Sequence, residues 1–451
     1  MKKAVGFFPP PFFYSSFFIP RLISPLFMKA AIKQQFSGLG KSATLAINEK
    51  SEALEQEGKD IIRFGFGQSP FPVPDAVVNS LKENAHRKEY ISVEGLPELR
   101  EAVASYHSEQ TDVDADASRV FIGPGSKELM FLLQFILDGD TIIPTPSWVS
   151  YPPQAHMINR PVHFIHSSAE TGWLITADAL DQFLTENQSD NTRLLILNYP
   201  NNPSGTTFSE NNLKELAETA RKHEILVLSD EIYGRLTHSG EHRSIAEFYP
   251  EGTIVSSGLS KWCGAGGWRL GHFLFPKGME ELMQSMASAA SETFSCVSAP
   301  VQCAAVRAYQ TDEPIIDYLF HARRILKTIG QTCSDRLNES GIQTIDPKGG
   351  FYLFPDFSNH KESLASRDVT DSASLCEMLL DETGVALLPG SEFFRDPAEL
   401  TARLAYVTFD GGKAMELSTE RGNDSFSMDD LSPVCDKIIN GISRITNWVN
   451  T

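Results

Sequence analysis

Short apolar runs rich in β-branched residues recur along the chain from about residue 75, and amphipathic stretches separate them. Apolar runs of this length predict buried strands, whereas apolar residues at helical spacing predict covering helices. The predicted strands are 119–122, 141–144, 193–197, 225–228, 253–256 and 271–275. The predicted helices are 127–137, 177–184 and 210–223. This alternation is typical of the α/β class, in which helices flank a mostly parallel sheet.

A second unit is expected toward the C-terminus, because a chain of 451 residues is too long for one ordinary core. The pattern there predicts a long helix, a strand, a helix and a strand at 314–340, 349–357, 373–382 and 404–409. The polar, Ser- and Asp-rich stretch 416–430 predicts a solvated loop before a closing helix at 433–449.

Residues 1–27 differ from the rest of the chain. Their charges are all basic, aromatic residues crowd together, and no acidic residue appears before Glu49. Both a targeting leader and an upstream extension of the reading frame, with synthesis starting at Met28, fit this composition. Prolines at positions 9–11, 20 and 25 would break a membrane-spanning helix. We therefore expect no membrane partner and a cytoplasmic location, with organelle targeting by this segment left open.

Charge and cysteine content narrow the possible functions. The formal net charge of −19 argues against nucleic acid as a partner, because binding to a phosphate backbone needs clustered Lys and Arg. The six cysteines form no CxxC pair and no Cys/His spacing suited to zinc, so we expect reduced packing residues and no metal site. Cys263, close to Lys261, is either a reactive thiol or an inert wall residue.

Candidate chemistry begins with Lys261, which follows a predicted strand in a Ser- and Gly-rich turn. A lysine that forms an imine must lose its proton, so it needs a desolvated or cation-rich site. Asp230 and Asn202 follow two other predicted strands, and Tyr233 comes three residues after Asp230. An acid can keep a pyridine nitrogen protonated, while an amide and a phenol can donate to a phenolate oxygen. Helix capping by Asp230 and turn formation by Asn202 are the structural alternatives.

An anion site is predicted where another strand meets a helix. Gly123 and Gly125 follow the run 119–122, and Ser126 and Lys127 open the next helix. Free backbone N–H groups and the helix dipole favour a phosphate group at such a position. Arg269 could add a charge-assisted contact to the same phosphate.

Together these features resemble the class I/II aminotransferases, which are pyridoxal-phosphate enzymes of fold type I. The resemblance extends from about Gly38 to Phe409 and rests on several motifs in order. These are GQSPF, KEYISVEGLPELREAV, GPGSKEL, PSWVSY, YPNNPSGTTF, SDEIYG, LSKWCGAGGWRLGH, GGFYLF, LLPGS and ARLAY. The resemblance implies a large cofactor-binding domain at 76–313 and a smaller α+β domain made from both chain ends, 28–75 and 314–451.

The resemblance also implies how the cofactor, pyridoxal 5'-phosphate, would be held. Lys261 would carry it as an imine and move the substrate proton. Asp230 would pair with the ring nitrogen, and Tyr233 and Asn202 with the phenolate oxygen. The other expected cofactor contacts, on the ring face or the phosphate, are Gly125, Ser126, Lys127, Trp148, Arg269 and, from a neighbouring subunit, Tyr90.

Substrate contacts follow from the same resemblance. Arg403 would bind the α-carboxylate, since its planar fork suits a carboxylate. Gly67 would let substrate approach the backbone, while Trp148 and Asn202 would also touch it. The contact by Tyr90 makes a homodimer the expected assembly. One departure is Gly258, where many relatives have a phosphate-binding serine; Ser256, Ser257 and Ser260 could compensate.

The implied activity is the transfer of an amino group from an L-amino acid to a 2-oxo acid by a ping-pong mechanism. A lyase of the aminocyclopropane-carboxylate synthase type and a non-catalytic regulatory module are the alternatives. The donor stays open. Ser291 stands where animal-type aspartate enzymes have an arginine, and Lys41 lies near the lysine of bacterial-type dicarboxylate users. A neutral or aromatic donor is slightly preferred, with aspartate as the other candidate.

Overall fold

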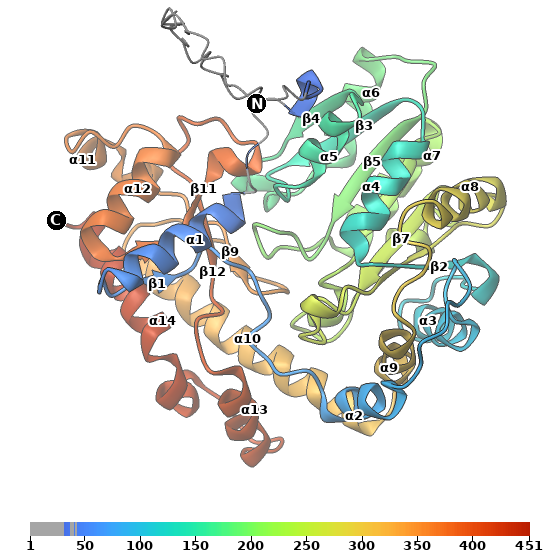
Figure 1. Cartoon of the computed structure of the whole chain (residues 1–451). Helices are drawn as coiled ribbons and strands as arrows, with labels where there is room; N and C mark the ends of the chain where they lie inside the picture. The colour runs from blue at the N-terminus through green and yellow to red at the C-terminus, as the bar shows by residue number, and fades with distance from the viewer. Residues whose placement is uncertain (1–30, 37–39, 41–42) are drawn as a thin grey trace, which may run out of the picture.

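A seven-stranded sheet forms the centre of the computed structural model, which describes residues 31–36, 40 and 43–451 (Figure 1). Its order is β2 (Val120–Gly123), β8 (Gly271–Leu274), β7 (Thr253–Gly258), β6 (Leu226–Asp230), β5 (Arg193–Asn198), β3 (Asp140–Thr145) and β4 (Val162–His166). Strand β8 is antiparallel to both its neighbours, and all other pairs are parallel. The predicted α/β class is confirmed.

Helices cover both faces of this sheet. In β5, Leu194 and Ile196 pack on one side, whereas Leu195 and Leu197 pack on the other. One face carries α4 (Ser126–Ile136), α5 (Tyr151–Met157) and α8 (Glu280–Ser291); the other carries α2 (Asp75–Asn84), α3 (Pro97–Gln110), α6 (Ala177–Glu186), α7 (Glu210–Lys222) and α9 (Ala299–Tyr309). Burial on both faces explains why these strands appear in the sequence as continuous apolar runs.

Segments from both chain ends form the smaller unit, beside the sheet (Figure 1). β1 (Ile62–Arg63) pairs with β10 (Val385–Ala386), and Figure 1 shows α1 (Ala43–Gln56) among C-terminal elements. A second sheet has the order β11 (Leu388–Pro389), β12 (Ala402–Ala405) and β9 (Tyr352–Leu353). The helices are α10 (Glu313–Glu339), α11 (Lys361–Ala365), α12 (Ser372–Thr383), α13 (Gly411–Glu420) and α14 (Met428–Val449). The domain boundaries stay predictions.

All six strands predicted for the main sheet are present, but β4 was missed. This edge strand, VHFIH, has one buried residue, Ile165, and therefore lacks the apolar run that marks the central strands. The three predicted helices correspond to α4, α6 and α7 within two residues at each end.

Three predictions for the C-terminal part were wrong in extent. The loop predicted at 416–430 is helical up to Glu420, because Asp410 caps α13 and Ala414 packs in the core. It is helical again from Met428, where α14 begins ahead of the helix predicted at 433–449. The strand predicted at 349–357 is the two-residue β9, and that predicted at 404–409 is β12. The predicted strand is too long because buried residues such as Tyr406 continue the apolar pattern beyond Ala405. The hydrogen-bonded ladder ends before them.

Residues 1–27, including the predicted leader, lie outside the described residues. Within the described part of the chain, no helix combines the length and apolar character needed to cross a membrane.

Candidate active site

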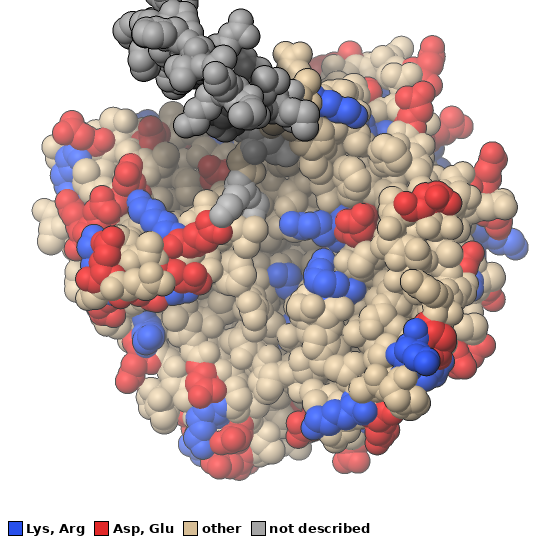
Figure 2. Space-filling model, viewed as in Figure 1, with Lys and Arg blue, Asp and Glu red and all other residues tan. Residues whose placement is uncertain are grey.

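A cavity of about 430 Å³ lies between the C-terminal ends of β5, β6 and β7 and the smaller unit. Figure 2 shows Lys and Arg side chains gathered at a hollow in the middle of this face. The predicted residues that line the cavity are Gly67, Ser126, Lys127, Trp148, Asn202, Asp230, Tyr233, Lys261, Arg269 and Arg403. Residues up to 336 positions apart in the sequence (Gly67 and Arg403) thus meet in one pocket.

Asp230 ends β6 and is buried at the wall of the cavity. The Tyr151 hydroxyl donates to its Oδ2 at 2.5 Å, and the backbone N–H of Ile232 donates to Oδ1 at 3.4 Å. Burial raises the pKa of Asp230 to about 7, and the hydrogen bond from Tyr151 opposes this rise. The structure therefore does not support a helix-capping role for Asp230, because its carboxylate lies at the cavity wall.

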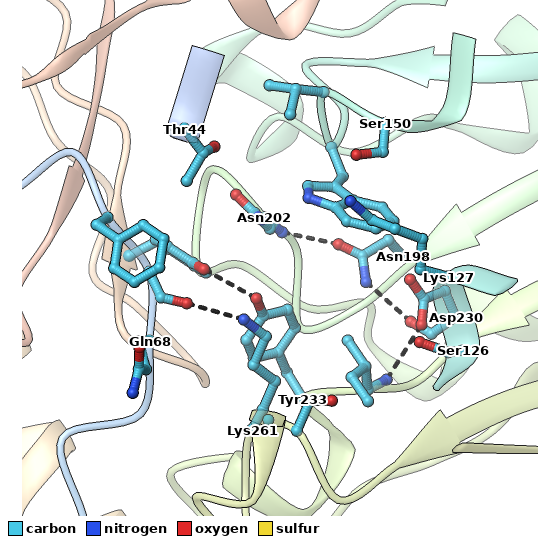
Figure 3. Close-up of a pocket in the computed structure, with 18 of the residues that line it drawn as sticks. Thr44, Gln68, Ser126, Lys127, Ser150, Asn198, Asn202, Asp230, Tyr233 and Lys261 are labelled. Carbon is cyan, nitrogen blue, oxygen red and sulfur yellow. Dashed lines mark hydrogen bonds between the residues drawn. The ribbon is translucent and has the colours of Figure 1, made fainter. Parts of the chain in front are cut away.

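Lys261 follows β7 in a turn and is half-buried. Its Nζ donates to the Gly67 carbonyl at 2.8 Å and lies 5.6 Å from the centre of the Tyr233 ring. Figure 3 shows Lys261 and Asp230 facing the same space from different sides, one from the turn after β7 and the other from β6. An amine and a buried acid thus share one pocket without forming an ion pair.

Arg403, in β12, is buried with 1% exposure, which rules out a surface arginine. Its Nη1 donates to Asn202 Oδ1 at 3.1 Å and its Nη2 to the Gly65 carbonyl at 2.6 Å. Its buried Nε has no hydrogen-bond partner among the described residues. A buried donor without a partner is costly, so this side of the fork is suited to an anionic ligand.

Asn202 does not serve the turn that contains it. Its backbone N–H donates to Asn198 Oδ1 at 2.8 Å, and the turn is closed by Asn201, whose Oδ1 accepts from Ser204. The Asn202 side chain is left to contact Arg403 and the cavity. The turn-forming alternative therefore applies to Asn201 rather than to Asn202.

Tyr233 and Gly67 both contact a residue that the sequence analysis did not single out, Tyr352. The two tyrosine hydroxyls lie 2.9 Å apart. A Cβ at Gly67 would come within 2.0 Å of the Tyr352 hydroxyl, so a larger residue there would require the Tyr352 side chain to shift. The absence of a side chain at position 67 thus keeps the pocket open beside Lys261.

The residues predicted for the anion site lie at the N-terminus of α4. Gly125 has a φ of +91°, a conformation that favours glycine, and a Cβ there would lie 2.3 Å from Arg269 Nη2. Arg269 itself is held at φ +54° and donates to the Gly266 carbonyl at 2.9 Å. The Arg269 guanidinium therefore lies close to the backbone that precedes Ser126.

Trp148 and Lys127 form the outer wall of the pocket. Lys127 Nζ lies 4.8 Å from the centre of the Trp148 ring. Trp148 packs its partly buried ring against two apolar clusters while lining the cavity. It therefore combines a core position with a face available to a ligand.

The remaining predictions have mixed outcomes. Tyr90 is 89% exposed and does not line the cavity. Gly258 has no room for a serine side chain, because a Cβ would lie 2.7 Å from the Leu270 carbonyl oxygen; of the three serines considered, Ser260 lines the cavity. Lys41 lies outside the described residues.

All six cysteines are free, as predicted. Burial raises the pKa of Cys263 to about 12, which favours the inert wall residue over the reactive thiol. Among the described residues, no group of three or more His, Cys, Asp or Glu side chains is arranged to hold a metal ion.

Sequence reasoning missed several lining residues, of which Tyr151 and Tyr352 matter most. Both stand inside motifs that carry the family resemblance, PSWVSY and GGFYLF. Their positions in these motifs are the sequence signal that could have identified them as site residues. Their partners, Asp230 and Tyr233, lie 79 and 119 residues away along the chain.

Comparisons with known proteins agree with the fold and the pocket. The family model for aminotransferase class I and II matches residues 59–406. Aspartate aminotransferases of Bacillus sp. (strain YM-2) and Bacillus subtilis are 32% and 33% identical over 393 and 389 residues. These alignments cover 84% of this chain in both cases and 96% and 94% of the relatives.

A solved structure of aspartate aminotransferase from Thermus thermophilus with maleate superimposes with a TM-score of 0.77 at 28% identity, covering 87% of this chain and 99% of that chain. The chain belongs to the class I/II aminotransferase family and is a transaminase. The lyase and regulatory alternatives gain no support from these relatives.

The buried carboxylate leads to a prediction about stability. The unfolded chain loses the Asp230 proton near pH 3.8, but the folded chain without cofactor loses it near 7. The folded state therefore loses stability as the pH rises between these values. Asp230→Asn should stabilise the cofactor-free protein by about 2 kcal/mol at about pH 8, and this gain should shrink as the pH falls toward 4. Urea unfolding across this pH range measures the effect.

Tyr151→Phe is the matched control for this effect. It removes the donor to the charged carboxylate, so it should destabilise the protein at about pH 8 by roughly 1–3 kcal/mol. If Asp230→Asn had the same free energy of unfolding as wild type at every pH, the claim that Asp230 carries a buried charge would be wrong.

Proposed function

We propose that this aminotransferase binds pyridoxal 5'-phosphate covalently through Lys261 and exchanges amino groups between an L-amino acid and a 2-oxo acid by a ping-pong mechanism. The observation that carries the proposal is the convergence of an amine, a buried acid and an anion cradle on one cavity. Each of the three groups suits a different part of the cofactor, namely the aldehyde, the ring nitrogen and the phosphate.

The residues present fit the cofactor. A Cβ at position 125 would collide with Arg269, so a glycine there keeps the cradle open next to the first N–H groups of α4. Asp230 is buried and no cationic side chain of the described residues bonds to it, which leaves its charge available for a protonated ring nitrogen. Trp148 offers an aromatic face, and Tyr233 and Asn202 offer polar groups.

The bound cofactor would supply an electron-withdrawing ring that eases loss of the donor's α-proton. Lys261 Nζ is the group positioned to take that proton and return it, because it faces the cavity beside the Gly67 carbonyl. Arg403 would hold the α-carboxylate through its unpartnered Nε and its fork. The donor leaves as a 2-oxo acid, and a second 2-oxo acid then takes up the amino group.

Three observations favour aspartate as the donor over the neutral or aromatic donor preferred from the sequence. Curated relatives are aspartate aminotransferases, and a similar solved structure was determined with maleate, a dicarboxylate. The exposed Lys127 stands at the pocket wall, and no carboxylate of the described residues pairs with it. It is therefore available to a distal carboxylate, although the phosphate is its other candidate ligand.

A homodimer, with Tyr90 reaching the partner's phosphate, and a cytoplasmic location complete the proposal. The strongly exposed ring of Tyr90 is compatible with a contact to a second chain.

The direct test uses purified protein with added pyridoxal phosphate. Wild type should show a visible absorbance band that an amino acid donor discharges and a 2-oxo acid restores. Lys261→Ala should abolish the band, while Lys214→Ala, an exposed lysine on α7, should keep it. A band and full half-reactions in Lys261→Ala would overturn the proposal.

Lys127→Met tests the donor assignment. Loss of a charged hydrogen bond should lower kcat/KM for aspartate about 10- to 100-fold and leave that for alanine or phenylalanine within about threefold. Steady-state kinetics with each donor, together with the cofactor dissociation constant, distinguish binding of the distal carboxylate from binding of the phosphate. An equal fall for every donor with weaker cofactor binding would assign Lys127 to the phosphate and refute the distal-carboxylate role.

A further inference from the structure

Arg235 is a buried guanidinium close to the active site that the proposed chemistry does not use. It lies in the short helix η4 (Gly234–Leu236), directly after Tyr233, and is 6% exposed. Its guanidinium carbon lies 4.0 Å from the centre of the Trp262 ring and 4.7 Å from that of Tyr106. Two aromatic side chains thus hold one planar cation.

This cation has no carboxylate partner among the described residues. Its one hydrogen bond goes from Nη1 to the Ala308 carbonyl at 3.2 Å. Burying a charge without an ion pair is costly, and an apolar side chain would suit such a core better. The aromatic faces offset part of this cost. Arg235 lowers the stability of the folded protein at this position, which indicates that it has a role in the neighbouring active site.

The contact joins the two segments that carry the proposed chemistry. Trp262 follows Lys261, and its fully buried indole has no hydrogen-bond partner for Nε1 among the described residues. Packing alone therefore fixes its ring. On the other side, Arg235 continues the segment that begins with Asp230, and its carbonyl accepts from Arg323 Nε of α10 at 2.8 Å.

We propose that Arg235 is a positioning residue whose guanidinium, held between Trp262 and Tyr106, fixes the Lys261 turn relative to the segment of Asp230 and Tyr233. The consequence for activity rests on the proposed function of Lys261; the structural link does not. A lysine at position 235 would keep the charge but could not stack a planar group between two rings.

The first test needs no cofactor. Hydrogen–deuterium exchange of cofactor-free protein follows the turn after β7, where the Gly264 and Ala265 N–H groups donate to the carbonyls of Lys261 and Leu259. Arg235→Met should speed exchange of these amides at least about tenfold, because methionine cannot stack a planar cation between the Trp262 and Tyr106 rings. Arg160→Met is the matched control, since Arg160 is a buried arginine that bonds Thr141 and Asp140 away from the cavity.

The second test measures the half-reaction with a saturating amino donor. A shifted Lys261 amine should lower kcat of Arg235→Met by about 10- to 100-fold while KM stays within about threefold. Arg235→Lys should not rescue kcat, and Arg160→Met should lower thermal stability without lowering kcat.

The outcomes distinguish the positioning role of Arg235 from the proposed function of Lys261. Exchange and kcat of Arg235→Met that match those of Arg160→Met would overturn the positioning role. Full rescue by Arg235→Lys would also overturn it, because charge rather than stacking would then be the cause. If wild type shows no half-reaction, the proposed function fails, and the exchange result alone still decides whether Arg235 holds the turn.

Discussion

A buried carboxylate at the end of a central strand is the constraint around which this site is arranged. Asp230 is surrounded by protein, and burial raises its pKa even though Tyr151 donates to it. A charge in this position weakens the folded protein on its own and becomes useful when a cation faces it. The protonated ring nitrogen of the proposed pyridoxal phosphate would be such a cation.

The parallel sheet brings the other groups to that carboxylate. Asn198 pairs with Asp230 across β5 and β6, so these two strands end at one level, whereas β7 continues to Gly258 beyond Ser256, the partner of Asp230. The turns that follow them carry Asn202, Tyr233 and Lys261 into one cavity. The smaller unit closes the cavity with Arg403, whose unpartnered Nε marks a second anion position.

Sequence alone could predict the groups that follow strands, because parallel strands present their C-terminal ends at one edge. Lys261, Asp230 and Asn202 are of this kind. Tyr151 and Tyr352 could not be given roles, because their hydrogen bonds depend on how α5 and β9 pack against distant segments. Edge strand β4 could not be predicted because it lacks an apolar run. The start of 416–430 is helical although its residues are mostly polar, so the sequence predicted a loop there. Tyr90 does not line the cavity, and the role proposed for it requires a second chain.

Borohydride reduction of the cofactor-loaded protein, followed by peptide mass spectrometry, tests the central claim most directly. Reduction makes the bond between lysine and cofactor permanent, so the modified residue can be read from the peptide. One cofactor per chain on the peptide that contains Lys261 is the expected result. Modification of a different lysine, such as Lys127, or of none, would contradict the claim that Lys261 and Asp230 serve one bound ring.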